Sequence, residues 1–182
     1  MTSGEGEIAG VDDPGPGLDL SALQGWIKSL GIGAQGRLRF RRVGLGQSNL
    51  TMEVRDEGLG RWILRRPALG ELAASAHDIV REARILAALE RSPVKVPRVV
   101  GLGDDDSVLS VPFVLVEHVD GLVVDSMPMA QAIAPQVRGR LSDDMITNLA
   151  AIHAVDLEDS GLADLSSHGP YAARQLRRWS GQ

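Results

Sequence analysis

The sequence predicts an α+β fold organised around an antiparallel sheet. Short segments with apolar residues at alternate positions fill the first two thirds of the chain, and glycine-containing turns separate several of them. Turns this short connect neighbouring strands as hairpins, so these strands should pair antiparallel. After Gly121 the patterns are helical only. Strands and helices therefore do not alternate as in βαβ units, which argues against a dinucleotide-binding fold.

Five segments have strand character. In the first, basic residues alternate with Leu38, Phe40 and Val43, as expected for a strand with one buried face. The segment Glu57–Gly60 supplies a hairpin turn, and Pro67 ends the strand that follows this turn. The predicted strands are Arg37–Val43, Asn49–Arg55, Arg61–Arg66, Arg98–Leu102 and Pro112–Val119.

Helical spacing of apolar residues appears in four segments. Asp19 is a suitable N-cap for the first helix, and Gly31 ends it. Ser142 is the predicted N-cap of the third helix, with two aspartates in its first turn. The predicted helices are Leu18–Leu30, His77–Arg91, Leu141–Val155 and Pro170–Trp179.

Composition excludes several classes of protein. With 182 residues, of which 43% are hydrophobic, the chain is long enough for one domain-sized core but too short for two full domains. A net charge of −5 argues against broad binding to nucleic acid or membrane surfaces. The absence of cysteine excludes disulfides and thiolate zinc sites and is compatible with the cytoplasm. Residues 1–17 are rich in glycine and acidic residues, and we expect a disordered tail without signal-peptide character.

A glycine-rich turn joins the first two predicted strands. It contains Gly44, Gly46, Gln47, Ser48 and Asn49. Two glycines allow the backbone to approach a phosphate closely and to direct N–H groups at it. The turn resembles the kinase pattern G-x-G-x-x-G, although Asn49 occupies the third glycine position. An ordinary hairpin turn is the alternative interpretation.

A cation and a carboxylate follow in an order that suggests an ion pair. Arg65 lies after three large apolar residues in the third strand, where kinases place a phosphate-binding lysine. Glu82 lies beside the apolar face of the next helix and needs a partner there. We predict that it pairs with Arg65, while Arg66 points to solvent on the opposite side of the strand. A snorkelling Arg65 and a solvated Glu82 are the alternatives.

The last predicted strand leads into a short polar segment. Glu117, His118 and Val119 precede Asp120 and Gly121. In kinases a hinge at this place offers backbone C=O and N–H groups to adenine. Any strand that ends in a turn would look similar, so the order of the four elements matters more than this segment alone.

In this order, the motifs resemble the aminoglycoside phosphotransferase and choline-kinase-like family, which has a protein-kinase-like fold. The branch is similar to the phosphotransferase domains linked to acyl-CoA dehydrogenases, and the resemblance runs from about Leu18 to the C-terminus. The matching stretches are Gly44–Thr51, Trp62–Pro67, Ser75–Glu82, Val96–Val100, Pro112–Gly121, Leu149–Asp156, Gly161–Asp164 and Arg174–Trp179.

The resemblance implies a five-stranded antiparallel small lobe with its helix, followed by the first helices of a large lobe. Residues 18–119 would form the small lobe, and residues 120–182 the hinge, the linker and a truncated start of the large lobe. It also implies ATP or GTP with Mg²⁺ as cofactors. Arg65 would contact the phosphates, Glu82 would pair with Arg65, and Glu117–Val119 would form the adenine hinge. The partners would be a nucleotide and a small-molecule alcohol.

The sequence lacks the family's catalytic loop, His-Gly-Asp-x-x-x-x-Asn. None of the four histidines begins this motif. His168-Gly169 comes nearest to it, but Pro170 stands where the aspartate is required. Asp104–Asp106 forms an acidic turn that we interpret as solvated rather than as a metal site. We therefore expect no catalytic residue or metal ligand in this chain and no turnover by it alone. A non-catalytic nucleotide-binding or regulatory module is the alternative, and an exposed apolar face in the truncated lobe would favour self-association.

Overall fold

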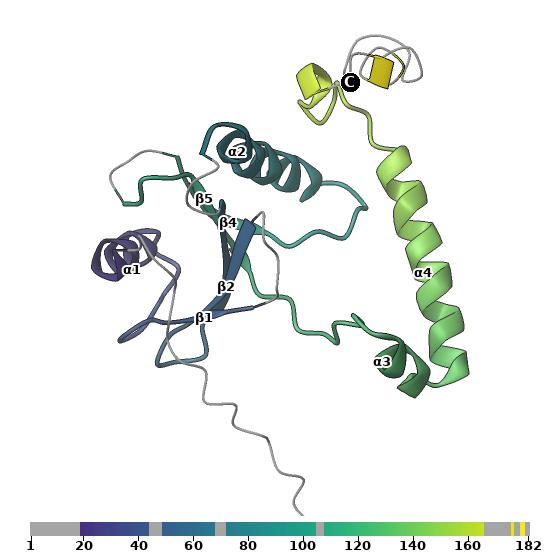
Figure 1. Ribbon diagram of the computed structural model, residues 1–182, viewed down its shortest axis with the longest axis horizontal. Helices are drawn as coiled ribbons and strands as arrows, with labels where there is room; N and C mark the ends of the chain where they lie inside the picture. Colours follow the sequence, from purple (N-terminus) through teal and green to yellow (C-terminus); the bar gives the residue numbers. More distant parts are fainter. Residues whose placement is uncertain are drawn as a thin grey trace, which may run out of the picture.

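The computed structural model describes residues 19–43, 49–67, 72–104, 108–165, 176, 179 and 180. These residues form a five-stranded antiparallel sheet with strand order β1-β2-β3-β5-β4 (Figure 1). Its strands are β1 (Arg39–Arg42), β2 (Asn49–Arg55), β3 (Arg61–Pro67), β4 (Val99–Gly103) and β5 (Phe113–Glu117). The helices are α1 (Leu20–Ser29), α2 (Leu72–Leu89), α3 (Met127–Ala132) and α4 (Pro135–His153), followed by the short 3-10 helix η1 (Ala163–Leu165). The predicted fold class is confirmed.

Helix α1 covers one face of the sheet. Its buried Leu23 and Ile27 belong to a core cluster that includes Met52, Val54 and Leu64 from β2 and β3. Trp26 of α1 packs edge-on against Phe113 of β5, with ring centroids 4.7 Å apart. The helix begins where the sequence predicts, because the Asp19 carboxylate accepts hydrogen bonds from the Ser21 and Ala22 N–H groups.

Helix α2 covers the opposite face. Ile79 and Ala83 of α2 pack against Val114 and Val116 of β5, with Ile63 of β3 partly buried beside them. Both faces of the sheet are therefore packed by a helix, and the residues of any central strand meet protein on both sides. Each charged side chain of β3 consequently points toward a face that a helix covers.

The β2–β3 hairpin is organised by one aspartate. The side chain of Asp56 accepts hydrogen bonds from the N–H groups of Gly58 and Gly60, at 2.9 and 2.8 Å, and from Gln35 N–H at 2.9 Å. A side chain at Gly60 would collide with Trp62, which makes this glycine necessary. The predicted turn is thus present, and it also anchors the segment before β1.

The helical half differs from the prediction in its boundaries. Helix α4 begins at Pro135, which needs no N–H partner in the first turn, and not near Leu141. Ser142 is consequently not an N-cap: it lies inside the helix, and its hydroxyl donates to the Arg138 carbonyl at 3.1 Å. Helix α3 has no counterpart in the prediction. The predicted tail 1–17 lies outside the described residues, and so does the predicted helix 170–179 apart from Leu176 and Trp179, which are helical.

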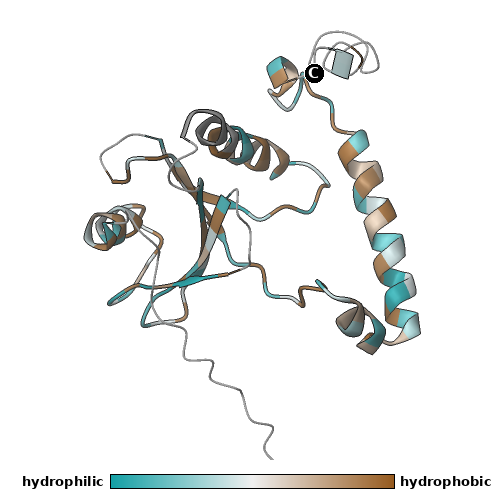
Figure 2. Cartoon of the chain, viewed as in Figure 1, coloured by the Kyte–Doolittle hydropathy of each residue, from teal (hydrophilic) through white to brown (hydrophobic). Residues whose placement is uncertain are grey.

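Helix α4 exposes its apolar side chains. All of α4 is described, and none of its residues is buried. Figure 2 shows apolar residues along its length, and the exposed large ones are Val137, Leu141, Met145, Ile146, Leu149 and Ile152. The exposed apolar face predicted for this helix is confirmed. Within the described part of the chain, no helix has the length and hydropathy needed to cross a membrane.

Candidate functional site

The predicted contact between Arg65 and Glu82 is present. Arg65 lies on the face of β3 that is covered by α2, and its Nη1 donates to Glu82 Oε1. The side chains retain 34% and 26% of their exposed area, so the pair is neither sealed in the core nor free in solvent. A guanidinium held in this way keeps donors available on its accessible side.

The prediction for Arg66 is wrong. Its side chain is only 1% exposed, and its Nη1 donates to the Pro67 carbonyl at 3.1 Å. Burial lowers the pKa of Arg66, and the nearby charge of Arg42 lowers it further. The alternation argument is correct in placing Arg66 opposite Arg65. That side of the sheet, however, is the α1 face with Trp62 and Leu64, and not solvent.

Most of the predicted phosphate turn lies outside the described part of the chain. Gly44, Gly46, Gln47 and Ser48 lie outside the described residues. Asn49 is the first residue of β2, and its side-chain Oδ1 is buried without a hydrogen-bond partner among the described residues. Buried side-chain oxygens of this kind normally accept a hydrogen bond.

The predicted hinge residues lie where β5 leaves the sheet. The Glu117 N–H donates to the Arg98 carbonyl at 2.9 Å, and the Glu117 carboxylate accepts from Arg98 N–H at 3.0 Å. The His118 N–H donates to the Arg61 carbonyl at 3.4 Å, while Val119 is 65% exposed. A pocket of about 780 Å³ is lined by Glu117 and Val119, with residues that precede β4. This pocket is on the β4 side of the hinge, and Arg65 does not line it.

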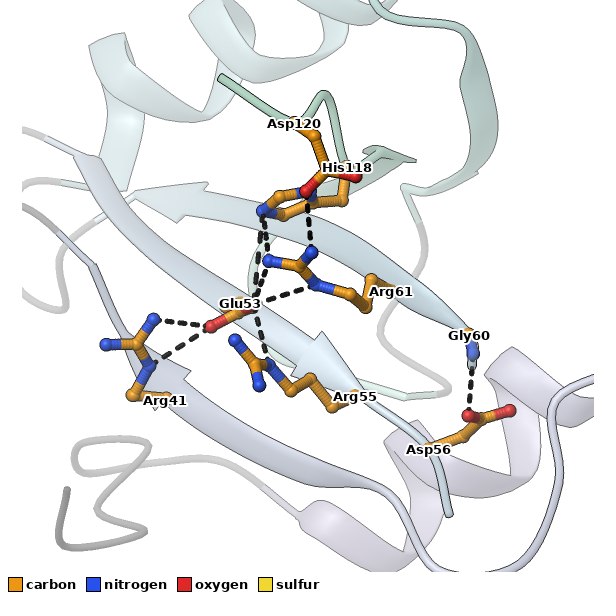
Figure 3. Close-up of polar contacts among 8 residues, drawn as sticks. All are labelled: Arg41, Glu53, Arg55, Asp56, Gly60, Arg61, His118 and Asp120. Carbon is orange, nitrogen blue, oxygen red and sulfur yellow. Dashed lines mark hydrogen bonds and ion pairs between the residues drawn. The ribbon is translucent and has the colours of Figure 1, made fainter. Parts of the chain in front are cut away.

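A buried carboxylate that the sequence prediction missed lies on the same sheet face as Arg65. Glu53 of β2 is 2% exposed and directly opposite Ile63 in the β2–β3 register. Among the described residues, three arginine side chains converge on it (Figure 3): Arg41 at 2.6 Å, Arg55 at 2.7 Å and Arg61 at 3.1 Å. Alternation with Met52 and Val54 would have placed Glu53 on this face, but only the strand register reveals its partners.

The arginines keep Glu53 ionised. Burial raises the pKa of its carboxyl, but hydrogen bonds from Arg55, Arg41 and Arg61 outweigh this effect, and the pKa falls from 4.5 to about 2. Removing one partner of such a buried network would leave charge without compensation. The network therefore stabilises the β1–β3 sheet next to the hinge.

Potential metal ligands are scarce in the described part of the chain. No group of three or more His, Asp or Glu residues in that part could hold a metal ion. Asp104 is exposed, whereas Asp105 and Asp106 lie outside the described residues. On this face of the sheet, the carboxylates of Glu53 and Glu82 already form ion pairs with arginines.

A model of the phosphotransferase enzyme family matches residues 39–182 of this chain. The chain belongs to this family. A crystal structure from Ralstonia eutropha, of a protein provisionally named as an aminoglycoside phosphotransferase, superposes with a TM-score of 0.72 at 30% identity. The superposition covers 90% of this chain and 46% of that protein.

Among curated proteins, this phosphotransferase-family chain is similar to acyl-CoA dehydrogenase family members. It is 35% identical to mouse family member 10 over 168 residues, which is 91% of this chain and 15% of the mouse protein. It is 26% identical to human family member 11 over 184 residues, which is 99% of this chain and 23% of the human protein. The chain thus spans less than a quarter of either relative.

Proposed function

We propose that this chain is the nucleotide-binding part of an ATP-dependent kinase that phosphorylates a hydroxyl group of a small molecule. The observation that carries the proposal is the Arg65–Glu82 ion pair, which joins β3 to α2 in a member of the phosphotransferase enzyme family. GTP would suit the same arrangement. Aminoglycosides, choline-like alcohols and hydroxyacyl thioesters are the candidate substrate classes.

Each residue of the site has a physical role in this proposal. Arg65 would bind the nucleotide phosphates, because a guanidinium grips phosphate oxygens through paired donors. Glu82 would hold the guanidinium in place. The N–H groups of Gly44–Ser48, next to Asn49, would line the phosphates, and the backbone of Glu117–Val119 would contact the base. Mg²⁺ would neutralise charge on the phosphates when bound.

We further propose that these 182 residues do not catalyse transfer by themselves, because they contain no His-Gly-Asp motif. In such enzymes the aspartate of this loop accepts the proton of the attacking hydroxyl. Phosphorylated product formed from ATP and a candidate alcohol by this chain alone would contradict the expected lack of catalysis.

We also propose a cytoplasmic location and self-association of the chain through the apolar face of α4.

The test is nucleotide binding measured by calorimetry with ATP and Mg²⁺. We expect Arg65→Ala and Glu82→Ala to weaken binding about 10- to 100-fold, since hydrogen bonds to charged groups contribute ~1.5–3 kcal/mol. Arg91→Ala is the matched control, because this exposed arginine follows α2 and lies outside the proposed site. Equal affinities of the unaltered chain and the three variants for ATP would contradict the proposed site.

A non-catalytic nucleotide-binding module is the second candidate. The absence of the catalytic-loop motif from these residues favours it. The two candidates differ when the chain is supplied with a polypeptide that carries the loop. Transfer of phosphate in that mixture would support a kinase, whereas binding of ATP without any transfer would support the module.

A further inference from the structure

We propose that Arg61 is a positioning residue that clasps the hinge to the sheet and thereby favours ligands with a base over bare polyphosphates. This inference rests on the proposed function, because it concerns the base-binding end of the same site. Arg61 is the first residue of β3, and it meets residues 57 and 59 positions further along the chain. Figure 3 shows it between Glu53 and the hinge.

The contacts of Arg61 connect three parts of the molecule. Its Nη1 donates to Asp120 Oδ1 at 2.6 Å, and its Nη2 lies 3.1 Å from both His118 Nε2 and Glu53 Oε1. Its carbonyl accepts the His118 N–H at 3.4 Å, which extends the β3–β5 ladder by one residue beyond the Trp62–Glu117 pair. Side chain and backbone of Arg61 therefore act on the same short hinge segment.

Glu53 makes this clasp rigid. Its Oε2 accepts from Arg41, and its Oε1 accepts from both Arg55 and Arg61. Because Glu53 is buried and ionised, the guanidinium of Arg61 is drawn against the sheet rather than left to sample solvent. Asp120 alone would not achieve this, since its side chain is 83% exposed and such ion pairs contribute little.

The contacts of Arg61 lie directly before a stretch of the chain that is exposed to solvent. Every residue of the described stretch from Gly121 to Pro128 is exposed. The position of the hinge backbone thus depends on contacts made before this stretch. Arg61 contacts the side chains of both His118 and Asp120, and His118 Nε2 also lies 3.9 Å from Glu53 Oε1. A base held by backbone groups of residues 117–119 requires these groups to be fixed, whereas phosphates at Arg65 do not.

The arrangement requires arginine at this position. The planar guanidinium donates from Nη1 to Asp120 and from Nε and Nη2 to Glu53, so it bridges the hinge and β2 at once. A lysine ammonium is a compact point charge on a flexible stem and cannot reproduce this fork. Arg61→Lys should therefore behave more like Arg61→Ala than like the unaltered protein.

The experiment compares the affinities for ATP and for inorganic tripolyphosphate, both with Mg²⁺, by calorimetry. We expect Arg61→Ala and Arg61→Lys to weaken ATP binding about tenfold while tripolyphosphate binding changes less than twofold. Asp120→Ala, an exposed change that should not disturb folding, is expected to shift the same ratio about two- to threefold. Arg39→Ala is the matched control, because Arg39 is an exposed arginine of β1 that belongs neither to the Glu53 network nor to the hinge in the described part of the chain.

The outcomes separate this inference from the proposed function. If the unaltered chain binds neither ligand, both proposals are overturned. If it binds both, and the ratio of the two affinities is the same in Arg61→Lys, Asp120→Ala and the unaltered chain, the clasp is overturned while the nucleotide site stands. Should Arg61→Ala not fold, as judged by circular dichroism, the Asp120→Ala ratio decides the question.

Discussion

The two halves of the chain use their apolar residues in opposite ways. In the half that contains the sheet, α1 and α2 bury two clusters of side chains against opposite faces of the strands. In the half that follows Gly121, α4 presents comparable residues, including Met145 and Ile146, to solvent at 74% and 67% exposure. The comparison indicates that the first half is stabilised by its own buried core, whereas packing against the described residues stabilises α4 little. Among the described residues, Lys95 N–H donates to Asn148 Oδ1 at 3.1 Å, and the Arg84 guanidinium donates to the Gly161 carbonyl and to the Asp164 carboxylate, both at 2.6 Å, which connects the halves.

The largest predicted effect tests this difference directly. Phe113→Ala should lower the free energy of unfolding by ~3–5 kcal/mol, because it removes a fully buried ring that contacts Trp26. Met145→Ala on α4 should change it by less than ~0.5 kcal/mol, as expected for an exposed position. Urea unfolding followed by tryptophan fluorescence provides both values. Similar losses for the two variants would show that α4 is packed as firmly as the sheet.

The next effect concerns the charged network of the sheet half. Glu53→Gln should destabilise the protein at pH 7 by up to ~3 kcal/mol, the free energy that corresponds to a fall in pKa from 4.5 to about 2. A carboxyl whose pKa is lowered by folding stabilises the protein at pH values above its unfolded-state pKa. This stabilisation is lost as the pH falls toward the folded-state pKa. The difference between the two proteins should therefore shrink between pH 4.5 and about 2. A difference that stays constant over this range in urea unfolding would contradict the assignment.

The smallest effect sharpens the comparison at the helix ends. Asp19→Ala should cost ~1 kcal/mol, because Asp19 accepts hydrogen bonds from two N–H groups at the start of α1. Ser142→Ala should cost less than ~0.5 kcal/mol, since Ser142 only bonds back to the Arg138 carbonyl inside α4. Thermal unfolding of the two variants checks the order. A larger loss for Ser142→Ala would restore the capping role expected from the sequence.

Local patterns were sufficient for much of the fold. The limits of β2, Asn49–Arg55, match the prediction, because alternation within one strand depends only on neighbouring residues. Asp19 was recognised as a cap for the same reason. The Arg65–Glu82 contact could also be predicted, since a strand that leads directly into a helix leaves a charged pair few alternatives.

Other features depended on parts of the chain that are distant in sequence. The Glu53 network joins β1, β2, β3 and the hinge, and no local pattern indicates which strands lie side by side.

The sequence by itself determined the order of the five strands and of helices α1, α2 and α4, the family and the pairing of Arg65 with Glu82, because periodicity and motif order are local properties of the chain. Only the tertiary structure decided that Arg66 is buried and that Glu53 gathers three arginines. The physical reason is that burial depends on what covers each face of a sheet. Here helices cover both faces, and a residue opposite a site residue therefore points into protein rather than water.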